Sequence, residues 1–192
     1  VPLAGVLGND VLGKFEVVID YPAGVMELSR QGHGSVPESA SALFFNGEHA
    51  KIKTTITARD QSGITVEQPV LLDVDTGARG ILLQGGTLTP LKSVSARGTE
   101  VLAGVGAESS QRRESLRVPV VKLPIGGSVV EHKLDAIWLD HDAPLRRHSP
   151  EMPGLLGYSA LQHHRVVIDY PGKRFALEKP EVTNVPVDVH QW

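Results

Sequence analysis

The sequence predicts a mostly β protein with one short helix. Short apolar runs recur along most of the chain, turns rich in Gly, Asp and Ser separate them, and only residues 159 to 164 favour a helix. The 192 residues, 41% of them hydrophobic, are enough to bury the core of one domain with some additional chain.

The first predicted strand, residues 50 to 57, alternates between apolar and polar side chains. The turn Asp60-Gln61-Ser62-Gly63 joins it to residues 64 to 66 as a hairpin. A buried strand follows at residues 70 to 74, and Leu82, Leu83 and residues 88 to 91 lead onward. The remaining strands are predicted at residues 116 to 123, at 129 to 139 beyond a Gly126-Gly127 turn, and in the closing run Val-Val-Ile-Asp-Tyr.

The buried strand at residues 70 to 74 runs directly into the turn Asp75-Thr76-Gly77-Ala78. The Thr76 hydroxyl can bond to a neighbouring backbone group, and Gly77 allows a sharp turn and the close approach of another chain segment. A strand end of this kind holds a carboxylate rigidly while leaving it accessible. Asp75 is therefore the candidate for water activation.

Further motifs follow the Asp75 turn in a characteristic order. They are a glycine-rich hairpin, a Gly-Leu-Leu-Gly turn at residues 154 to 157, a short helix and a closing strand Val-Ile-Asp-Tyr. Together with the Asp-Thr-Gly-Ala turn, this order resembles the retropepsin-like aspartic peptidases of bacteria over roughly residues 44 to 179. The resemblance implies an acid-protease β-barrel and an aspartic endopeptidase, a hydrolase with no cofactor.

The same resemblance implies roles for particular residues. Asp75 would be catalytic, and Thr76, Gly77 and Ala78 would support it. The hairpin at residues 101 to 111 would be the flap that closes over an extended peptide substrate, with Gly104, Val105 and Gly106 at its tip.

An internal repeat relates the two ends of the chain. A shift of 149 residues (154 − 5) places Gly5 on Gly154 without gaps, and 11 of the 24 residues from 5 to 28 are then identical, including the run Val-Val-Ile-Asp-Tyr-Pro. A period of this length indicates duplicated domains, because solenoid repeats have periods of about 20 to 50 residues.

The repeat predicts the organisation of the chain. Residues 1 to 30 would be the C-terminal segment of a preceding copy, residues 31 to 42 a linker, residues 43 to 180 the peptidase-like domain and residues 181 to 192 a tail. The body of the preceding copy would lie upstream of Val1, with any Asp-Thr-Gly turn of its own about 74 residues before it, at the place that the 149-residue shift gives.

A single Asp-Thr-Gly turn supplies only half of an aspartic peptidase site. The mechanism needs two carboxylates about 3 Å apart that share one proton, because two charges so close cannot both ionise. The second carboxylate would come from a homodimer or from the upstream repeat. Either way, a monomer of this chain is expected to be inactive.

Two residues depart from the family pattern. Asp73 occupies a position that is usually apolar, and a buried carboxylate would need a partner or a proton there, so either the strand is locally exposed or a basic residue pairs with it. We interpret Asp73 as structural. Arg79 stands where a short polar residue is more common, and a cation beside Asp75 would disturb the shared proton. These departures leave open an alternative function, a non-catalytic module of the same fold that binds peptides or assembles complexes.

Other classes of function find less support. Asp73 and Asp75 match a calcium loop poorly, since Gln84 stands where a bidentate Glu is needed, and no further metal ligands can be placed. His141, His148, His163 and His164 are interpreted as surface residues. The net charge of −3, with scattered Lys and Arg, argues against a nucleic-acid partner.

The sequence says little about compartment. No apolar run reaches the roughly 20 residues of a membrane span. Cysteine is absent, which fits an oxidising compartment or the cytoplasm. Because the chain starts at Val1, we expect a processed or shortened polypeptide, and a periplasmic or secreted location is favoured over the cytoplasm.

Overall fold

A computed structural model describes residues 5, 7–30, 36–47, 49–84, 86–102, 111–130, 134–139 and 154–180. The chain divides into two compact units, which are described separately. The first unit contains Val1–Ala50, Ile125–Ser128 and Leu161–Trp192, and the second contains Lys51–Pro124 and Val129–Ala160. The described residues are mostly β, with three short helices, which confirms the predicted fold class.

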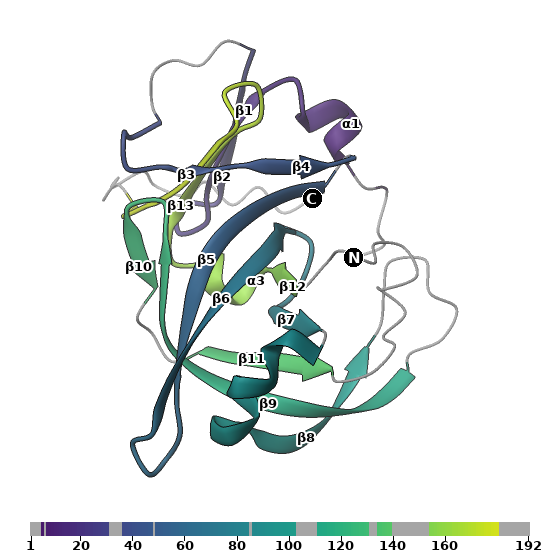
Figure 1. Cartoon of the computed structure of the whole chain (residues 1–192). Helices are drawn as coiled ribbons and strands as arrows, with labels where there is room; N and C mark the ends of the chain where they lie inside the picture. The colour runs from purple at the N-terminus through teal and green to yellow at the C-terminus, as the bar shows by residue number, and fades with distance from the viewer. Residues whose placement is uncertain are drawn as a thin grey trace. The chain divides into compact units, whose positions relative to one another are not determined.

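The second unit consists mainly of β5 (His49–Arg59), β6 (Thr65–Val74), β7 (Ile81–Gln84), β8 (Ala96–Leu102), β9 (Gln111–Ile125), β11 (Leu134–Leu139) and β12 (Gly154–Leu156). Six of these strands follow the order β9-β11-β7-β12-β6-β5, and β5 pairs again with β9. The sheet is therefore a closed six-stranded barrel, as the sequence predicted. β8 pairs with β9 outside this closed path (Figure 1).

The barrel interior is filled by large apolar side chains that are almost completely buried: Ile52, Ile56, Leu72, Leu83, Val118 and Trp138. They come from strands on all sides of the barrel, so their burial depends on the closure of the sheet. Closure also removes the exposed strand edges that an open sheet would leave.

The β5–β6 hairpin turns where the sequence predicted. The Asp60 carboxylate accepts hydrogen bonds from the Ile64 N–H (2.9 Å) and the Ser62 hydroxyl (2.8 Å), and Gly63 has a φ of 91°. The hydrogen bond from Ser62 lowers the pKa of the Asp60 carboxyl below its ordinary value. The two segments predicted at 64 to 66 and 70 to 74 form one strand, β6, because Pro69 interrupts the sequence pattern but not the pairing.

Lys51 and Asp73 form an ion pair inside the second unit. They lie directly opposite each other on β5 and β6, each is only 3% exposed, and the Lys51 Nζ lies 3.3 Å from Asp73 Oδ1. A buried carboxylate needs such a partner to remain charged. The interpretation of Asp73 as a structural residue with a basic partner is confirmed.

The first unit contains α1 (Asn9–Leu12), β1 (Glu16–Asp20), β2 (Val25–Ser29), β3 (Ser41–Ala42), β4 (Phe44–Asn46), β13 (Arg165–Asp169) and β14 (Arg174–Glu178). β10 (Ser128–Val130) lies mostly in the second unit, where it pairs with β9. The five-stranded sheet of the first unit has the order β2-β1-β13-β14-β3 (Figure 1). A Val18–Val167–Ala176 cluster is buried against one face, with Val36 and Ala40 packed on it.

The sequence repeat is also a structural repeat. The bounds of α1, β1 and β2 coincide, after a shift of 149 residues, with those of α3 (Tyr158–Leu161), β13 and β14. β1 and β13 pair antiparallel with Val18 opposite Val167, and these two valines are themselves equivalent in the repeat. The two hairpins are therefore related by a local two-fold axis through this valine pair.

The described residues form two helices in addition to the one that the sequence predicts. The helix predicted at 159 to 164 is α3 and ends earlier, at Leu161. α1 has only four residues, too few for a periodic apolar pattern, and only the repeat could have indicated it. The third helix, η1 (Gly86–Val94), is a 3₁₀ helix that contains Pro90.

Replacing Lys51 by Met should strongly destabilise the fold, because Asp73 would remain buried without a cation. We expect the free energy of unfolding to fall by about 3 to 5 kcal/mol, and most of this loss to be recovered in the double variant Lys51→Met/Asp73→Leu. Urea denaturation measures both, with Lys53→Met at an exposed position of the same strand as the control. A loss no larger in Lys51→Met than in the control would contradict this role.

Candidate functional site

Asp75 is the first residue beyond the end of β6. β12 lies between β6 and β7, parallel to the first and antiparallel to the second. The Asp75 N–H donates a hydrogen bond to the Leu156 carbonyl oxygen of β12 at 3.0 Å. The backbone that carries the carboxylate is therefore fixed by the barrel itself and not by a free loop.

The turn fixes the carboxylate of Asp75 through its own backbone. Asp75 Oδ1 accepts hydrogen bonds from the N–H groups of Gly77 (2.9 Å) and Ala78 (3.1 Å). The side chain is half-buried, and the described residues donate no hydrogen bond to Oδ2. One oxygen is thus held in place while the other is left without a donor from the described chain.

The segment after β12 holds the far side of the turn. The N–H groups of Tyr158 and Ser159 donate to the carbonyl oxygens of Ala78 (2.8 Å) and Arg79 (3.0 Å). A Cβ on Gly157 would lie 2.5 Å from the Ala78 oxygen and 2.6 Å from the Gly80 oxygen. Only a glycine allows the two segments to approach this closely.

Gly154, at the start of β12, makes a second close approach. A Cβ there would lie 2.4 Å from the carbonyl oxygen of Leu82 on β7 and 2.8 Å from a methyl carbon of Leu72 on β6. The two glycines of the Gly-Leu-Leu-Gly motif therefore let β12 fit between its neighbours. The motif acts on the candidate site through the backbone.

The remaining residues of the turn have distinct surroundings. Gly77 and Ala78 donate to Asp75 as supporting residues would. Thr76 is exposed, and its hydroxyl forms no hydrogen bond with the described residues, so the bond expected from the sequence is not observed among them. Arg79 is exposed, and within the described part of the chain no ion pair joins it to Asp75.

Several predicted features lie outside the described residues. These are the flap tip at Gly104, Val105 and Gly106, the loop at residues 140 to 153 with His141 and His148, and the tail from residue 181. Of the histidines, His163 is exposed and His164 is partly buried. The flap and the substrate contacts inferred from it therefore remain predictions.

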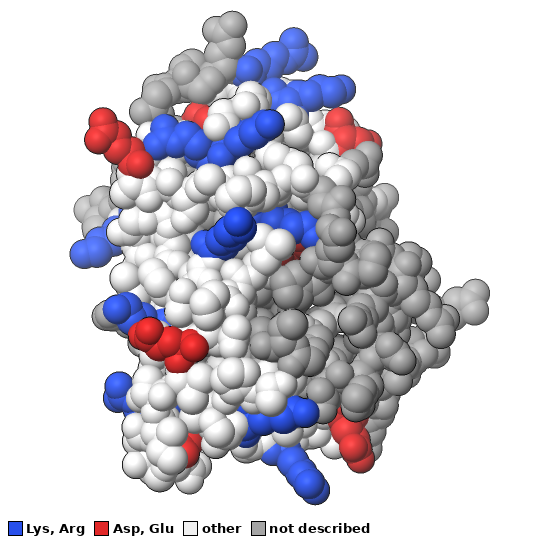
Figure 2. Space-filling view, viewed as in Figure 1, with Lys and Arg blue, Asp and Glu red and all other residues white. Residues whose placement is uncertain are grey.

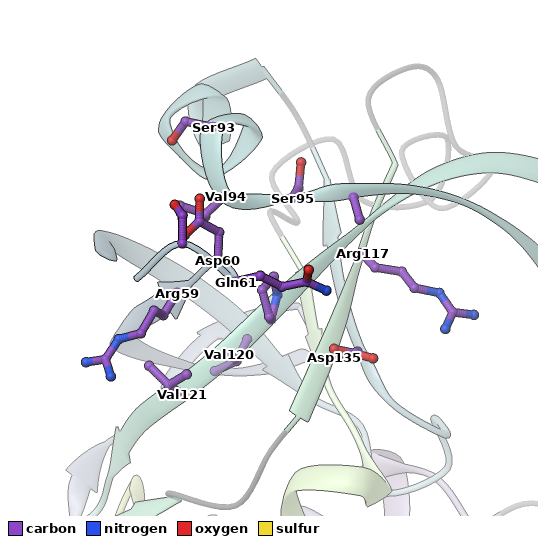
Figure 3. A pocket seen from close by; sticks show the side chains of 13 residues that line it. Arg59, Asp60, Gln61, Ser93, Val94, Ser95, Arg117, Val120, Val121 and Asp135 are labelled. Atoms are coloured by element: carbon purple, nitrogen blue, oxygen red, sulfur yellow. The ribbon is translucent and has the colours of Figure 1, made fainter. Parts of the chain in front are cut away.

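A hollow in the barrel unit contains no residue of the Asp75 turn. It has a volume of about 940 Å³, and its lining includes Asp60, Gln61 and Asp135. Figure 3 shows the side chains of Arg59 and Arg117 extending away from its middle on opposite sides. The Arg117 guanidinium is hydrogen-bonded to Glu100 (2.8 and 3.1 Å), so it is already occupied.

The described charged residues on the face that Figure 2 shows form no pattern that suggests another kind of site. Figure 2 shows Lys and Arg scattered among uncharged residues on the face in view. Among the described residues, no three His, Asp or Glu side chains lie close enough together to hold a metal ion. The same part of the chain has no helix that is long and apolar enough to cross a membrane.

Neither a protein-family model nor a curated protein matches this chain. The candidate site therefore depends on the geometry around Asp75.

Replacing Gly157 by Ala should disturb the candidate site and the fold together, because the added methyl group would meet two backbone carbonyl oxygens that cannot move independently. Overpacking of this kind costs about 1 to 3 kcal/mol of unfolding free energy. Gly80→Ala is a matched control in the same turn, since its Cβ would meet only the Ser159 hydroxyl at 3.8 Å. Thermal unfolding compares the two, and equal Tm values would show that the close approach is unimportant.

Proposed function

We propose that this chain carries one half of a retropepsin-like aspartic peptidase site, with Asp75 as its catalytic carboxylate. The observation that supports the proposal most directly is the hydrogen bonding of Asp75: one oxygen accepts from two backbone N–H groups, and the other receives no donor from the described residues. The carboxylate is oriented by rigid backbone and half-exposed, as a group that must meet a water molecule requires.

The chemistry would be hydrolysis of a peptide bond. In a dyad with one shared proton, the ionised carboxylate takes a proton from a water molecule as the water oxygen attacks the carbonyl carbon. The protonated carboxyl donates its proton to the carbonyl oxygen, which gives a tetrahedral diol. Breakdown of the C–N bond then releases a carboxylic acid and an amine, the amine nitrogen taking up a proton from the dyad.

The second carboxylate must come from another copy of the barrel, because this sequence has one Asp-Thr-Gly turn. The local two-fold relation between the β1-β2 and β13-β14 hairpins supports a two-copy arrangement, since dyads of this type are built from equivalent turns. Ala78 and Gly77 would hold Asp75, and the hairpin containing Gly104 to Gly106 would close over an extended peptide.

A non-catalytic module that binds peptides or takes part in assembly is the second candidate. The exposed Arg79 beside the turn favours it, because a cation that reached the dyad would stabilise two ionised carboxylates and remove the shared proton. The two candidates differ in whether Asp75 is needed for turnover.

Peptidase activity should depend on Asp75 and on acidic pH. In the protein with both barrels present, Asp75→Asn should lower kcat by about 10²- to 10⁴-fold, the usual contribution of an acid–base group. Activity should be highest near about pH 4 to 6, because the dyad loses its shared proton at higher pH and gains a second one at lower pH. Cleavage of a peptide library with mass-spectrometric detection measures both.

Asp135→Asn is the matched control, because this exposed carboxylate lines the hollow that contains no residue of the Asp75 turn, so its replacement should have no effect on activity. A transition-state analogue of the pepstatin type should inhibit the wild-type protein. Activity that survives Asp75→Asn would rule out the mechanism, and peptide binding without cleavage would favour the non-catalytic module.

A further inference from the structure

The segment from Gly5 through α1, β1 and β2, here called the first tail, repeats the helix and the two strands of the segment from Gly154 through α3, β13 and β14, here called the second tail. The two segments differ in their surroundings. In the second unit, the residues from Gly154 to Ser159 insert into the barrel and hold the Asp75 turn. Their equivalents in the repeat are residues 5 to 10, which lead into α1 as Gly157 leads into α3. The described chain therefore contains two such tails and one barrel.

Among the described residues, no backbone atom closely approaches the Cβ position of Gly5 or Gly8 in the first tail. Gly154 and Gly157 leave room for the carbonyl oxygens of Leu82, Ala78 and Gly80. Gly5, the equivalent of Gly154, has nothing within 4 Å of its Cβ position among the described residues, and the Cβ position of Gly8 meets only the Asp10 side chain. The first tail thus keeps an open gap at Gly5, where a barrel strand would fit, and a gap at Gly8 that only the Asp10 side chain enters (3.0 Å), where an Asp-Thr-Gly turn would fit.

Apolar side chains of the first tail are exposed where their equivalents are buried. Leu7 is 53% exposed and Met26 48%, whereas Leu156 and Phe175 are completely buried. The same contrast separates the exposed Val11 and Leu28 from the buried Ala160 and Leu177. Exposed side chains of this size, gathered in one segment, indicate a surface that another partner covers.

The strand register places part of this apolar surface on one face of the sheet. Met26 lies opposite Ile19, and Leu28 lies opposite Val17, so their side chains share a face with those of β1. β13 and β14 repeat the arrangement, with Ile168 opposite Phe175. The two halves of this face match in pattern and differ only in how much of each is exposed.

We propose that Leu7, Val11, Met26 and Leu28, together with the gaps at Gly5 and Gly8, form the docking surface for a second barrel that precedes Gly5 in the same polypeptide. This deepens the proposed function, because it names the partner that would bring the second carboxylate. The occupant is a barrel with its own β7-like strand and Asp-Thr-Gly-like turn, since those are the groups that the equivalent glycines admit.

A second molecule of this chain fits the surface poorly. In each molecule the place between β6 and β7 is already filled by its own β12, so its barrel has no room for a further tail. A barrel that lacks such a strand is needed, and the repeat assigns it to the chain ahead of Gly5. A homodimer would leave the gaps at Gly5 and Gly8 unfilled.

Oxidation of Met26 tests the docking surface without reference to peptidase activity. Hydrogen peroxide should oxidise Met26 readily in the 192-residue chain, where the side chain is half-exposed. In the full-length gene product, the rate should fall by roughly tenfold or more, because oxidation follows exposure. Peptide mass spectrometry measures the rate, and each polypeptide in denaturant provides the unprotected reference.

Gly5→Ala provides a second measurement in the same two polypeptides. The substitution should leave the Tm of the 192-residue chain unchanged and lower that of the full-length product by several degrees, whereas Gly154→Ala should lower both. Neither Met26 oxidation nor Tm depends on catalysis. The docking proposal can therefore be supported even if the peptidase assay shows that Asp75 is not catalytic.

Three results would overturn the proposal. The first is an equal rate of Met26 oxidation in the two polypeptides. The second is protection of Met26 in the 192-residue chain that grows with protein concentration, which would identify a homodimer as the occupant. The third is a gene product whose sequence ahead of Val1 is too short to form a barrel.

Discussion

The insertion of β12 between β6 and β7 is the constraint on which the second unit depends. It places Gly154 and Gly157 so close to backbone oxygens that a Cβ would not fit at either position. It also completes the barrel path and brings the Leu156 carbonyl oxygen within hydrogen-bonding distance of the Asp75 N–H. Because the bonds to the turn come from backbone groups, the position of Asp75 follows from the fold and does not depend on side-chain rotamers. A carboxylate held in this way loses little conformational entropy when a substrate or a second carboxylate binds.

The two carboxylates at the end of β6 have opposite surroundings. Asp73 is buried and paired with Lys51 on the neighbouring strand, whereas Asp75 is half-exposed and, within the described part of the chain, its carboxylate accepts hydrogen bonds from two backbone N–H groups. The ion pair keeps the charge of Asp73 balanced within the barrel. Asp73, the residue that departs from the apolar pattern of the strand, thus contributes to structure. Asp75 has the environment that the proposed function requires, so the different surroundings of the two carboxylates support different roles for them.

Local patterns were sufficient to predict most of this fold. Strand alternation, the Asp60 turn and the strand leading to Asp75 all depend on residues close together in sequence, and these elements are found as expected. The partner of Asp73 was expected only as a basic residue, because the pairing with Lys51 depends on the hairpin register. The two hydrogen bonds that orient the carboxylate likewise depend on turn geometry that sequence composition does not specify. The short α1 could be found only through the repeat.

The two copies of the repeat differ in how much their apolar side chains and glycines contribute to the stability of the fold. An exposed Met or Leu gains nothing from burial, and a glycine in open space adds conformational entropy to the unfolded chain without easing any contact in the folded one. Within the second unit, by contrast, Leu156 is fully buried and Gly154 and Gly157 relieve real contacts. Residues 5 to 28 thus keep the glycines and apolar side chains of an inserted tail, although no described residue fills the space at Gly5, and Leu7, Val11, Met26 and Leu28 remain exposed. That imbalance is resolved if these residues fold against a barrel of their own, and Asp75 is then one of two equivalent turns.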